Sequence, residues 1–487
     1  MKQVNLFDES PQHNKIPPVD KFQGAMLFSA IGDALGWPTE FLDASGRRKP
    51  SFTVPVTDFV QWQKLVGGKW WGYEEVIEPG SYSDDTQLAL AVARCINDVG
   101  IFETALFAYE ELPLWLQYER GGGRTVKTAA RNLISRNVDW LHNFYKQGDL
   151  NYSNAGANGA AMRNLPITLV NVGNEEQIIK DSFFNAIITH GHPRAIIGAM
   201  LFGLATNYVL TMPDAIKPEV MVEYLISEIE RAGRAVAGDV SVAKWISAWE
   251  RENKETTFRS SFHKYRQEAI SYLKSIGEHI DTDPKSYYAF IGALSPETKG
   301  SGVATVCAAI YLFLKYADQP KDAILASANV FGSDTDTVGT FLGALLGAHN
   351  GLKAIPDYLL MRVQDREYLC KTAERLHSIA LKKQRGQLAK ALSVDRQETY
   401  KKILAWETSL SNMFLGKVDE TKLVAHPALG SGKIIQRLEK PIQREGYVAR
   451  LIHVQFDCGQ SCIFHSRIEK GNKISESLAK DVLKALK

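Results

Sequence analysis

Apolar and small residues follow helical spacing most clearly near residue 340. Residues 335–349 are rich in both kinds, and Gly339, Gly343 and Gly347 lie four positions apart on one face of the expected helix. A helix face without side chains allows another backbone to approach closely. The sequence therefore predicts a central helix that is packed on several sides.

A second helix with the same property is predicted near the start of the chain. Residues 21–35 follow helical spacing, with Asp20 as the expected cap. Small or apolar residues recur at intervals of four along it, at Gly24, Phe28, Gly32 and Gly36. Further helical patterns cover residues 83–96, 103–118, 181–189, 194–210, 302–316 and much of 211–290. The greater part of the chain is therefore predicted to be helical.

The pattern changes towards the end of the sequence. Polar residues alternate with β-branched or aromatic ones in residues 433–438, 447–456 and 462–468, which predicts strands, and residues 457–461 resemble a hairpin turn. We therefore predict three parts, namely a loose leader (1–18), a helical domain (19–389) and a linker helix with a small β-rich accessory domain (390–487).

Two cysteines and two histidines in the predicted strands raise the alternative of a zinc site. Cys458 and Cys462 lie near His453 and His465, but the cysteine spacing is not that of a usual zinc knuckle. Strand residues also alternate between faces, so a hairpin with reduced thiols is the favoured interpretation.

Composition and charge serve mainly to exclude classes of partner and location. The net charge of +2 gives no argument for binding nucleic acid or an anionic membrane. Five scattered cysteines suit a reducing compartment. The first fifteen residues lack the apolar core of a signal peptide, and we expect no apolar run long enough to cross a bilayer. The expectation is a cytoplasmic protein.

Two acidic clusters each open an apolar helix. One acidic residue at a helix start would be an ordinary cap. Crowded carboxylates repel one another unless a cation neutralises them, and hard oxygen ligands suit Mg²⁺ or Mn²⁺ better than zinc. The two clusters predict a two-metal carboxylate site held by Ser83, Asp84, Asp85, Asp334, Asp336 and Thr337.

Five motifs, taken in order, resemble those of the ADP-ribosylglycohydrolase family, whose members are all-helical enzymes that remove ADP-ribose from modified targets. The motifs are Gly32-Asp33-Ala34-Leu35-Gly36 leading to Glu40, Ser83-Asp84-Asp85-Thr86, Asn158-Gly159-Ala160-Ala161-Met162-Arg163, Thr189-His190-Gly191-His192-Pro193 and Gly332-Ser333-Asp334-Thr335-Asp336-Thr337. They span about two thirds of the chain. The family usually has glycine where Ala160 stands.

The resemblance implies an all-α fold, a compact orthogonal helical bundle of the family's type, to which the β-rich appendage is added. It also implies two divalent ions, Mg²⁺ first and Mn²⁺ second, that orient the distal ribose. Glu40, Asp85 and Asp334 are the implied catalytic residues, and either Glu40 or a metal-bound aspartate assists proton transfer. Asp33 is expected to support the metal ligands. The implied substrate-binding residues are Asn158, Gly159, Ala160, Met162 and His190.

The expected function is metal-dependent hydrolysis of the glycosidic bond that links ADP-ribose to a modified protein or other conjugate. The motifs do not decide between arginine, serine and other acceptors. An alternative is an immunity or binding protein that neutralises a cognate ADP-ribosyltransferase by contact, using the β-rich tail and a glycine- and tryptophan-rich segment, 64–73, that is either a lid or a core-filling loop. A blocker does not need both acidic clusters. A metal-dependent phosphatase is a third interpretation, against which the absence of a His-rich ligand set counts.

Overall fold

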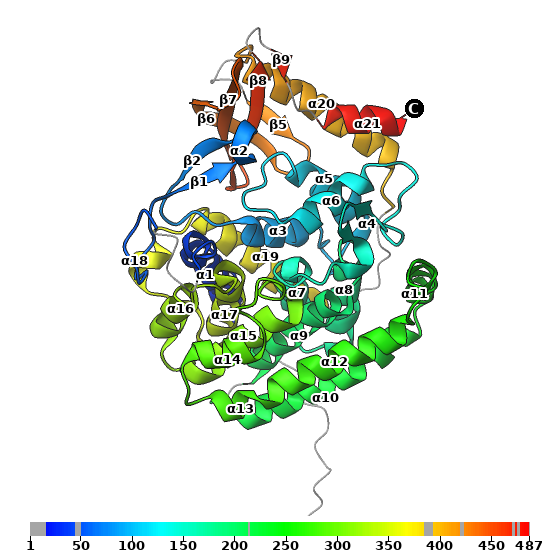
Figure 1. The fold of residues 1–487 in the computed structure, drawn as a ribbon, viewed down its shortest axis with the longest axis vertical. Helices are drawn as coiled ribbons and strands as arrows, with labels where there is room; N and C mark the ends of the chain where they lie inside the picture. Colours follow the sequence, from blue (N-terminus) through cyan, green and yellow to red (C-terminus); the bar gives the residue numbers. More distant parts are fainter. Residues whose placement is uncertain are drawn as a thin grey trace, which may run out of the picture.

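The computed structural model describes residues 16–43, 50–212, 215–383, 393–418, 423–469, 473–474 and 478–486. It has a large helical body with a small sheet at one end, shown at the top of Figure 1. The predicted helical bundle with a β-rich C-terminal appendage is therefore confirmed. The predicted leader falls mostly outside the described residues.

Two antiparallel helices in backbone contact form the centre of the body. α1 (Val19–Gly36) and α17 (Thr335–Asn350) approach so closely that a Cβ added to Gly32 would lie 2.0 Å from the Gly339 oxygen. A Cβ on Gly347 would lie 2.1 Å from the Gly24 oxygen. The glycine stripes that the sequence predicted on each helix therefore face each other.

Other apolar helices surround this pair. α15 (Gly302–Tyr316), a helix that the sequence predicted, and α16 (Pro320–Ala328) pack beside α17. α9 (Pro193–Thr211) packs against both α15 and α17. α9 is the one described helix that is long and apolar enough to cross a membrane by length and composition, contrary to the expectation from sequence. However, 89% of its apolar window is buried inside the protein, as in a core helix.

Shorter and more peripheral helices complete the body. They are α3 (Asp84–Arg94), α4 (Thr104–Leu106), α5 (Leu112–Trp115), α6 (Arg124–Leu133), α7 (Leu165–Val170), α8 (Glu175–Ile187), α10 (Pro218–Ala237), α11 (Val240–Glu252), α12 (Phe258–Lys274), α13 (Ile276–His279), α14 (Pro284–Phe290), α18 (Asp357–Leu360) and α19 (Arg366–Lys383). α10, α11 and α12 lie along the lower right of the body in Figure 1, far from the sheet.

The C-terminal sheet has five antiparallel strands in sequence order. They are β5 (Val424–His426), β6 (Gly430–Pro441), β7 (Tyr447–Phe456), β8 (Ser461–Glu469) and β9 (Lys473–Ile474), flanked by α20 (Arg396–Phe414) and α21 (Ala479–Leu486). The three strands predicted from sequence correspond to β6, β7 and β8. All five cysteines are free, and within the described residues neither Cys458 nor Cys462 belongs to a group that could hold a metal ion.

Polar contacts fasten this sheet to the helical body. Asp365, at a positive φ of 54°, accepts hydrogen bonds from the Tyr82 hydroxyl at 2.7 Å and from the Ser461 main-chain N–H at 2.9 Å. Arg94 of α3 donates to the Gln460 side chain at 2.8 Å. The sheet is therefore held against the helix that carries the first acidic cluster.

The glycine- and tryptophan-rich segment forms a hairpin. β1 (Trp62–Val66) and β2 (Tyr73–Ile77) pair antiparallel, with the short α2 (Gly68–Trp71) between them. Trp71 lies edge-on to Tyr447 of β7, with ring centroids 5.0 Å apart, and Trp70 is 65% exposed. The segment is therefore not a core-filling loop, because neither tryptophan is buried and the strand pair reaches the C-terminal sheet.

Substituting Gly339→Ala tests the contact between α1 and α17. The added methyl group would lie 2.4 Å from the Gly32 oxygen, so the helices must separate, and we expect a loss of roughly 1–3 kcal/mol in the free energy of unfolding. The matched control is Gly233→Ala in α10, where an added Cβ meets nothing within 4 Å. Better helix propensity should leave that variant as stable as wild type or slightly more so. Equal thermal unfolding of the two variants would contradict the contact.

Candidate metal centre and active site

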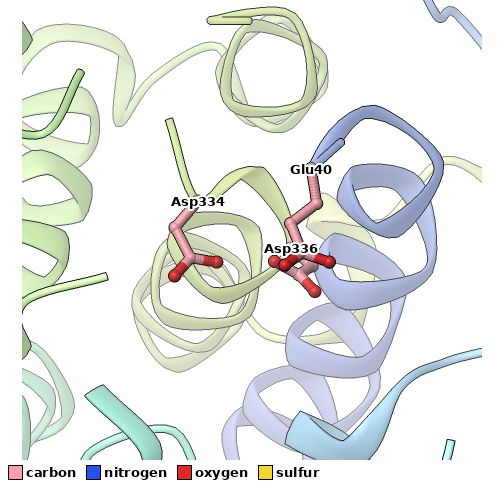
Figure 2. Close-up of side chains that lie close together, drawn as sticks. All are labelled: Glu40, Asp334 and Asp336. Atoms are coloured by element: carbon pink, nitrogen blue, oxygen red, sulfur yellow. The ribbon is translucent and has the colours of Figure 1, made fainter. Parts of the chain in front are cut away.

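Three carboxylates converge where the two central helices end their contact. Ligand atoms of Glu40, Asp334 and Asp336 lie within 4.8 Å of one another. Figure 2 shows the Glu40 side chain reaching from the end of the α1 segment towards Asp336, with Asp334 at the start of α17. Two stretches that are almost 300 residues apart in sequence thus meet in one acidic centre.

Local contacts explain why Glu40 lies there. A 3₁₀ turn (Trp37–Thr39) continues α1, and a Cβ on Gly36 would lie 2.3 Å from the Thr335 oxygen. The Thr39 hydroxyl donates to the Thr335 hydroxyl at 3.0 Å, which in turn donates to the Gly36 oxygen at 2.8 Å. The turn that carries Glu40 is therefore tied to the first turn of α17.

The other acidic cluster opens α3 and is held by Asp33 of α1. Asp33 accepts hydrogen bonds from the Ser83 N–H at 2.9 Å and from the Thr86 N–H and hydroxyl at 3.1 and 2.6 Å. Ser83 caps the helix through a bond from the Asp85 N–H. Asp33 thus fixes the helix start that presents Asp84 and Asp85.

The structure brings the two clusters into electrostatic contact. Burial first, then repulsion from Asp33, Asp84 and Asp334, raises the pKa of Asp85 well above its ordinary value, and the hydrogen bond from the Thr337 side chain opposes that rise. Burial and the charges of Glu40, Asp334 and Asp85 likewise raise the pKa of Asp336. All the predicted metal residues therefore lie in one region.

Glu40 and Asp84 show the same effect. Burial, followed by repulsion from Asp334, raises the pKa of Glu40 to about 8, and Lys64 and Lys299 oppose the rise. Burial, followed by repulsion from Glu119, raises the pKa of Asp84 to about 7. Without a cation, these carboxyls hold protons near neutral pH.

The donor set fits a hard divalent cation. Asp85 Oδ1 is buried and has no hydrogen-bond partner. Two glycines leave room around the carboxylates, because a Cβ on Gly121 would lie 3.0 Å from Asp84 Oδ1 and one on Gly300 would lie 3.1 Å from Asp334 Oδ2. Mg²⁺ and Mn²⁺ prefer carboxylate oxygens as ligands, and a bound cation would also satisfy the unpartnered oxygen of Asp85.

The predicted substrate loop adjoins this centre. Asn158 donates to Asp334 Oδ2 at 2.9 Å, and its main-chain N–H donates to the Gly300 oxygen, also at 2.9 Å. Gly159, Ala160 and Met162 are buried, so they can offer a ligand little beyond their main chain. Of this group, only Asn158 brings a side chain to the acidic centre.

His190 does not reach the surface of the site. Its ring is fully buried beneath the loop, and a Cβ on Gly159 would lie 3.0 Å from it. Its Nδ1 bonds the Thr189 hydroxyl at 2.7 Å, while Nε2 has no partner. The implied contact of His190 with ADP-ribose therefore stays a prediction, and in this conformation the ring is buried and only its Nε2 is left without a partner.

Buried Arg163 supports the same loop from below. It donates to the Gly159 oxygen at 2.9 Å and to the Asn185 side chain at 2.8 Å. The Thr189 hydroxyl accepts a third bond, at 2.8 Å. Arg163 is therefore a packing residue and not a ligand for phosphate.

A cavity of about 520 Å³ begins beyond the loop. Its wall includes Tyr152, His192, Trp249 and Tyr265. His192 contacts Tyr265, with ring centroids 4.4 Å apart, and a Cβ on Gly156 would lie 2.9 Å from His192 Nδ1. The loop therefore runs from an aromatic cavity to the acidic centre.

Several residues near the centre were not predicted from the sequence. Lys64 and Lys299 face Glu40, and Glu119 acts on Asp84. Gly121, at a φ of 98°, covers Asp84. A glycine run before a helix was visible in the sequence, but nothing there pointed to Lys64 or Lys299, which come from unrelated segments.

Comparison with known proteins identifies relatives of this chain. The family model described as ADP-ribosylglycohydrolase matches residues 14–386. An ADP-ribosylarginine hydrolase from Serratia proteamaculans is 24% identical over 373 residues, which is 74% of this chain and 80% of that protein. The ADP-ribosylhydrolase ARH3 of Danio rerio is 26% identical over 361 residues, covering 69% of this chain and 85% of the relative.

A third relative covers a shorter stretch. The ADP-ribosyl-[dinitrogen reductase] glycohydrolase of Rhodospirillum rubrum is 29% identical over 192 residues, or 39% of this chain and 58% of that protein. The matched family region ends before α20, so it leaves the C-terminal sheet outside.

The raised pKa values predict how metal-free stability depends on pH. The ordinary pKa values are 4.5 for Glu40 and 3.8 for Asp84, and in the folded protein they are raised to about 8 and about 7. At a pH between the ordinary and the raised value, the folded protein keeps a proton on each carboxyl that the unfolded chain has released. Stability without metal should fall as the pH rises from 5.5 to 8.5. Mg²⁺ competes with those protons, so its effect on Tm should be small at pH 5.5 and large at pH 8.5.

Thermal unfolding in Mg²⁺ and in EDTA at both pH values is the measurement. Asp318→Asn, on an exposed residue, is the control and should keep the trend, whereas Asp84→Asn should weaken it. A metal-free protein that becomes more stable with rising pH would contradict the acidic centre.

Proposed function

The chain belongs to the ADP-ribosylglycohydrolase family and hydrolyses the bond between ADP-ribose and a modified target, and we propose that it does so with divalent metal ions at the acidic centre described above. The observation that carries the proposal is the convergence of Glu40, Asp334 and Asp336 within 4.8 Å, beside a buried and unpartnered oxygen of Asp85. Crowded carboxylates of this kind need a counter-charge.

The proposed ligands are Ser83, Asp84, Asp85, Asp334, Asp336 and Thr337, which lie in two helix starts held together by Asp33 and by the contact between α1 and α17. We propose two ions, with Mg²⁺ as the natural occupant and Mn²⁺ as a substitute. When bound, such ions supply positive charge that fixes the ribose hydroxyls and orients the anomeric carbon.

The protein's own groups then act on the glycosidic bond. The bond from the anomeric carbon to the acceptor breaks, the sugar passes through an oxocarbenium-like state, and neighbouring carboxylates stabilise its positive charge. A water adds to the anomeric carbon, and the proton that it loses ends on the departing acceptor. Glu40 or one of the aspartates Asp85 and Asp334 carries that proton.

The remainder of the ligand should extend away from Asp334 along the loop. Asn158 contacts Asp334, and small residues let a diphosphate approach the loop's main chain. The cavity of about 520 Å³ at the far end has aromatic walls that suit a purine base. Adenosine is therefore proposed to lie against His192 and Tyr265, whose rings contact each other in the wall of this cavity.

We propose a modified arginine as the acceptor. Relatives from Serratia proteamaculans and Pseudomonas putida are named ADP-ribosylarginine hydrolases. A guanidino group is cationic once released, which suits departure from a centre lined by carboxylates. The five free cysteines favour a reducing, cytoplasmic setting for this reaction.

The alternative of a purely steric transferase blocker draws no support from the relatives. Their names are those of hydrolases. A blocker would also have no use for buried carboxylates that destabilise one another.

Release of free ADP-ribose is the direct test. Arginine-modified and serine-modified proteins are incubated with the enzyme in Mg²⁺ and in EDTA, and we expect metal-dependent release from the arginine conjugate. Asp334→Asn should lower turnover at least about 100-fold while leaving the fold intact, because it removes one ligand from the centre. Exposed Asp318→Asn is the matched control and should keep full activity. Full activity of Asp334→Asn, or release that EDTA does not reduce, would contradict the proposed centre.

A further inference from the structure

A groove of about 520 Å³ lies beside the turn that carries Glu40. Pro38, Phe41 and Leu42, which bracket Glu40 in the chain, form one wall. Four consecutive residues of β1, Trp62 to Leu65, form part of the other wall. Lys64, which lines the groove, acts electrostatically on Glu40 and Asp84, so the groove adjoins the acidic centre, and it shares no lining residue with the aromatic cavity beyond Asn158.

The groove combines an apolar surface with few charges. Phe41 is 38% exposed and Leu65 is 59% exposed. The ammonium group of Lys64 lies 4.8 Å from the Trp37 ring centroid and 5.3 Å from that of Phe41, so its charge is turned towards the aromatic wall. Glu74, the cross-strand partner of Leu65, provides the one acidic group among the lining residues. Such a surface suits apolar residues of a partner better than a phosphate.

The strand in this wall has a free edge. In the described part of the chain, β1 pairs with β2 alone, in a two-stranded sheet. Consecutive residues of a strand line a groove together when its edge, and not one face, is turned towards the groove. An extended polypeptide can add to such an edge through its main chain while apolar side chains choose the register.

The C-terminal sheet holds the hairpin in position. Arg467 of β8 donates to the Trp71 oxygen at 2.9 Å, and the Arg444 guanidinium lies 4.1 Å from the Trp71 ring centroid. At the opposite end of the hairpin, Trp62 packs against Trp37, with ring centroids 5.3 Å apart. The appendage therefore supports one wall of the groove, although it lies outside the matched family region.

We propose that this groove binds the polypeptide that carries the ADP-ribose, as an extended segment next to the modified residue, with Phe41 and Leu65 as specificity contacts. The inference rests on the proposed function, because a polypeptide attached at the anomeric carbon must lie next to the acidic centre, and this groove adjoins the turn that carries Glu40. The ADP-ribose itself lies along the Asn158 loop. The C-terminal sheet is then part of a substrate-recognition unit.

The test compares one linkage in two contexts, free ADP-ribosyl-arginine and an arginine-ADP-ribosylated protein. Leu65→Glu should raise KM for the modified protein about tenfold, with kcat unchanged, since it removes an apolar anchor. Hydrolysis of the free conjugate should not change, because that substrate lacks the flanking segment. Leu65→Thr, which keeps a good strand residue, should give a smaller rise in the same direction.

Leu483→Glu, on a residue that is 50% exposed on α21, is the matched control and should leave both substrates unaffected. Unmodified target protein should also compete with the modified protein for the wild type, and compete less well for Leu65→Glu. An unchanged KM for the modified protein in a folded Leu65→Glu variant, or the same rise in Leu483→Glu, would overturn the groove assignment alone. Failure of the wild type to hydrolyse either arginine conjugate would instead contradict the proposed function, and the inference with it.

Discussion

The arrangement of the site depends on backbone contact between α1 and α17. No side chain separates these helices at Gly24, Gly32, Gly339 and Gly347, so their relative position is set by main-chain atoms and cannot adjust through side-chain rotamers. Because the helices are antiparallel, the end of α1 meets the start of α17. Glu40 and Asp336 therefore meet as a consequence of how the core packs.

The same helix also positions the other half of the centre. Asp33 lies one turn before the end of α1 and accepts three hydrogen bonds from Ser83 and Thr86. Packing of α1 thus aligns both acidic helix starts at once. Bringing so many carboxylates together is unfavourable without a counter-charge. The packing of the surrounding core holds this locally unfavourable arrangement in place at a functional site.

Much of this arrangement could be predicted from the sequence, for identifiable reasons. Glycines at intervals of four predict a close approach, and a doubled acidic start of an apolar helix predicts a cation, because each follows from local spacing. The partner of each stripe could not be predicted, since spacing on one helix does not say which other helix faces it. His190 shows a different limit, because a motif position does not reveal whether its side chain is exposed or buried. Lys64 and Glu119 were missed because only the tertiary fold brings them near Glu40 and Asp84.

The central claim is that the two helix starts form one cation-binding centre. Anomalous scattering from crystals of the full chain grown with Mn²⁺ tests it most directly, because the signal locates the ions without assuming an activity. The account predicts peaks bounded by the carboxylates of Asp84, Asp85, Asp334 and Asp336. Peaks elsewhere, or ordered carboxylates with no peak between them at saturating Mn²⁺, would contradict it.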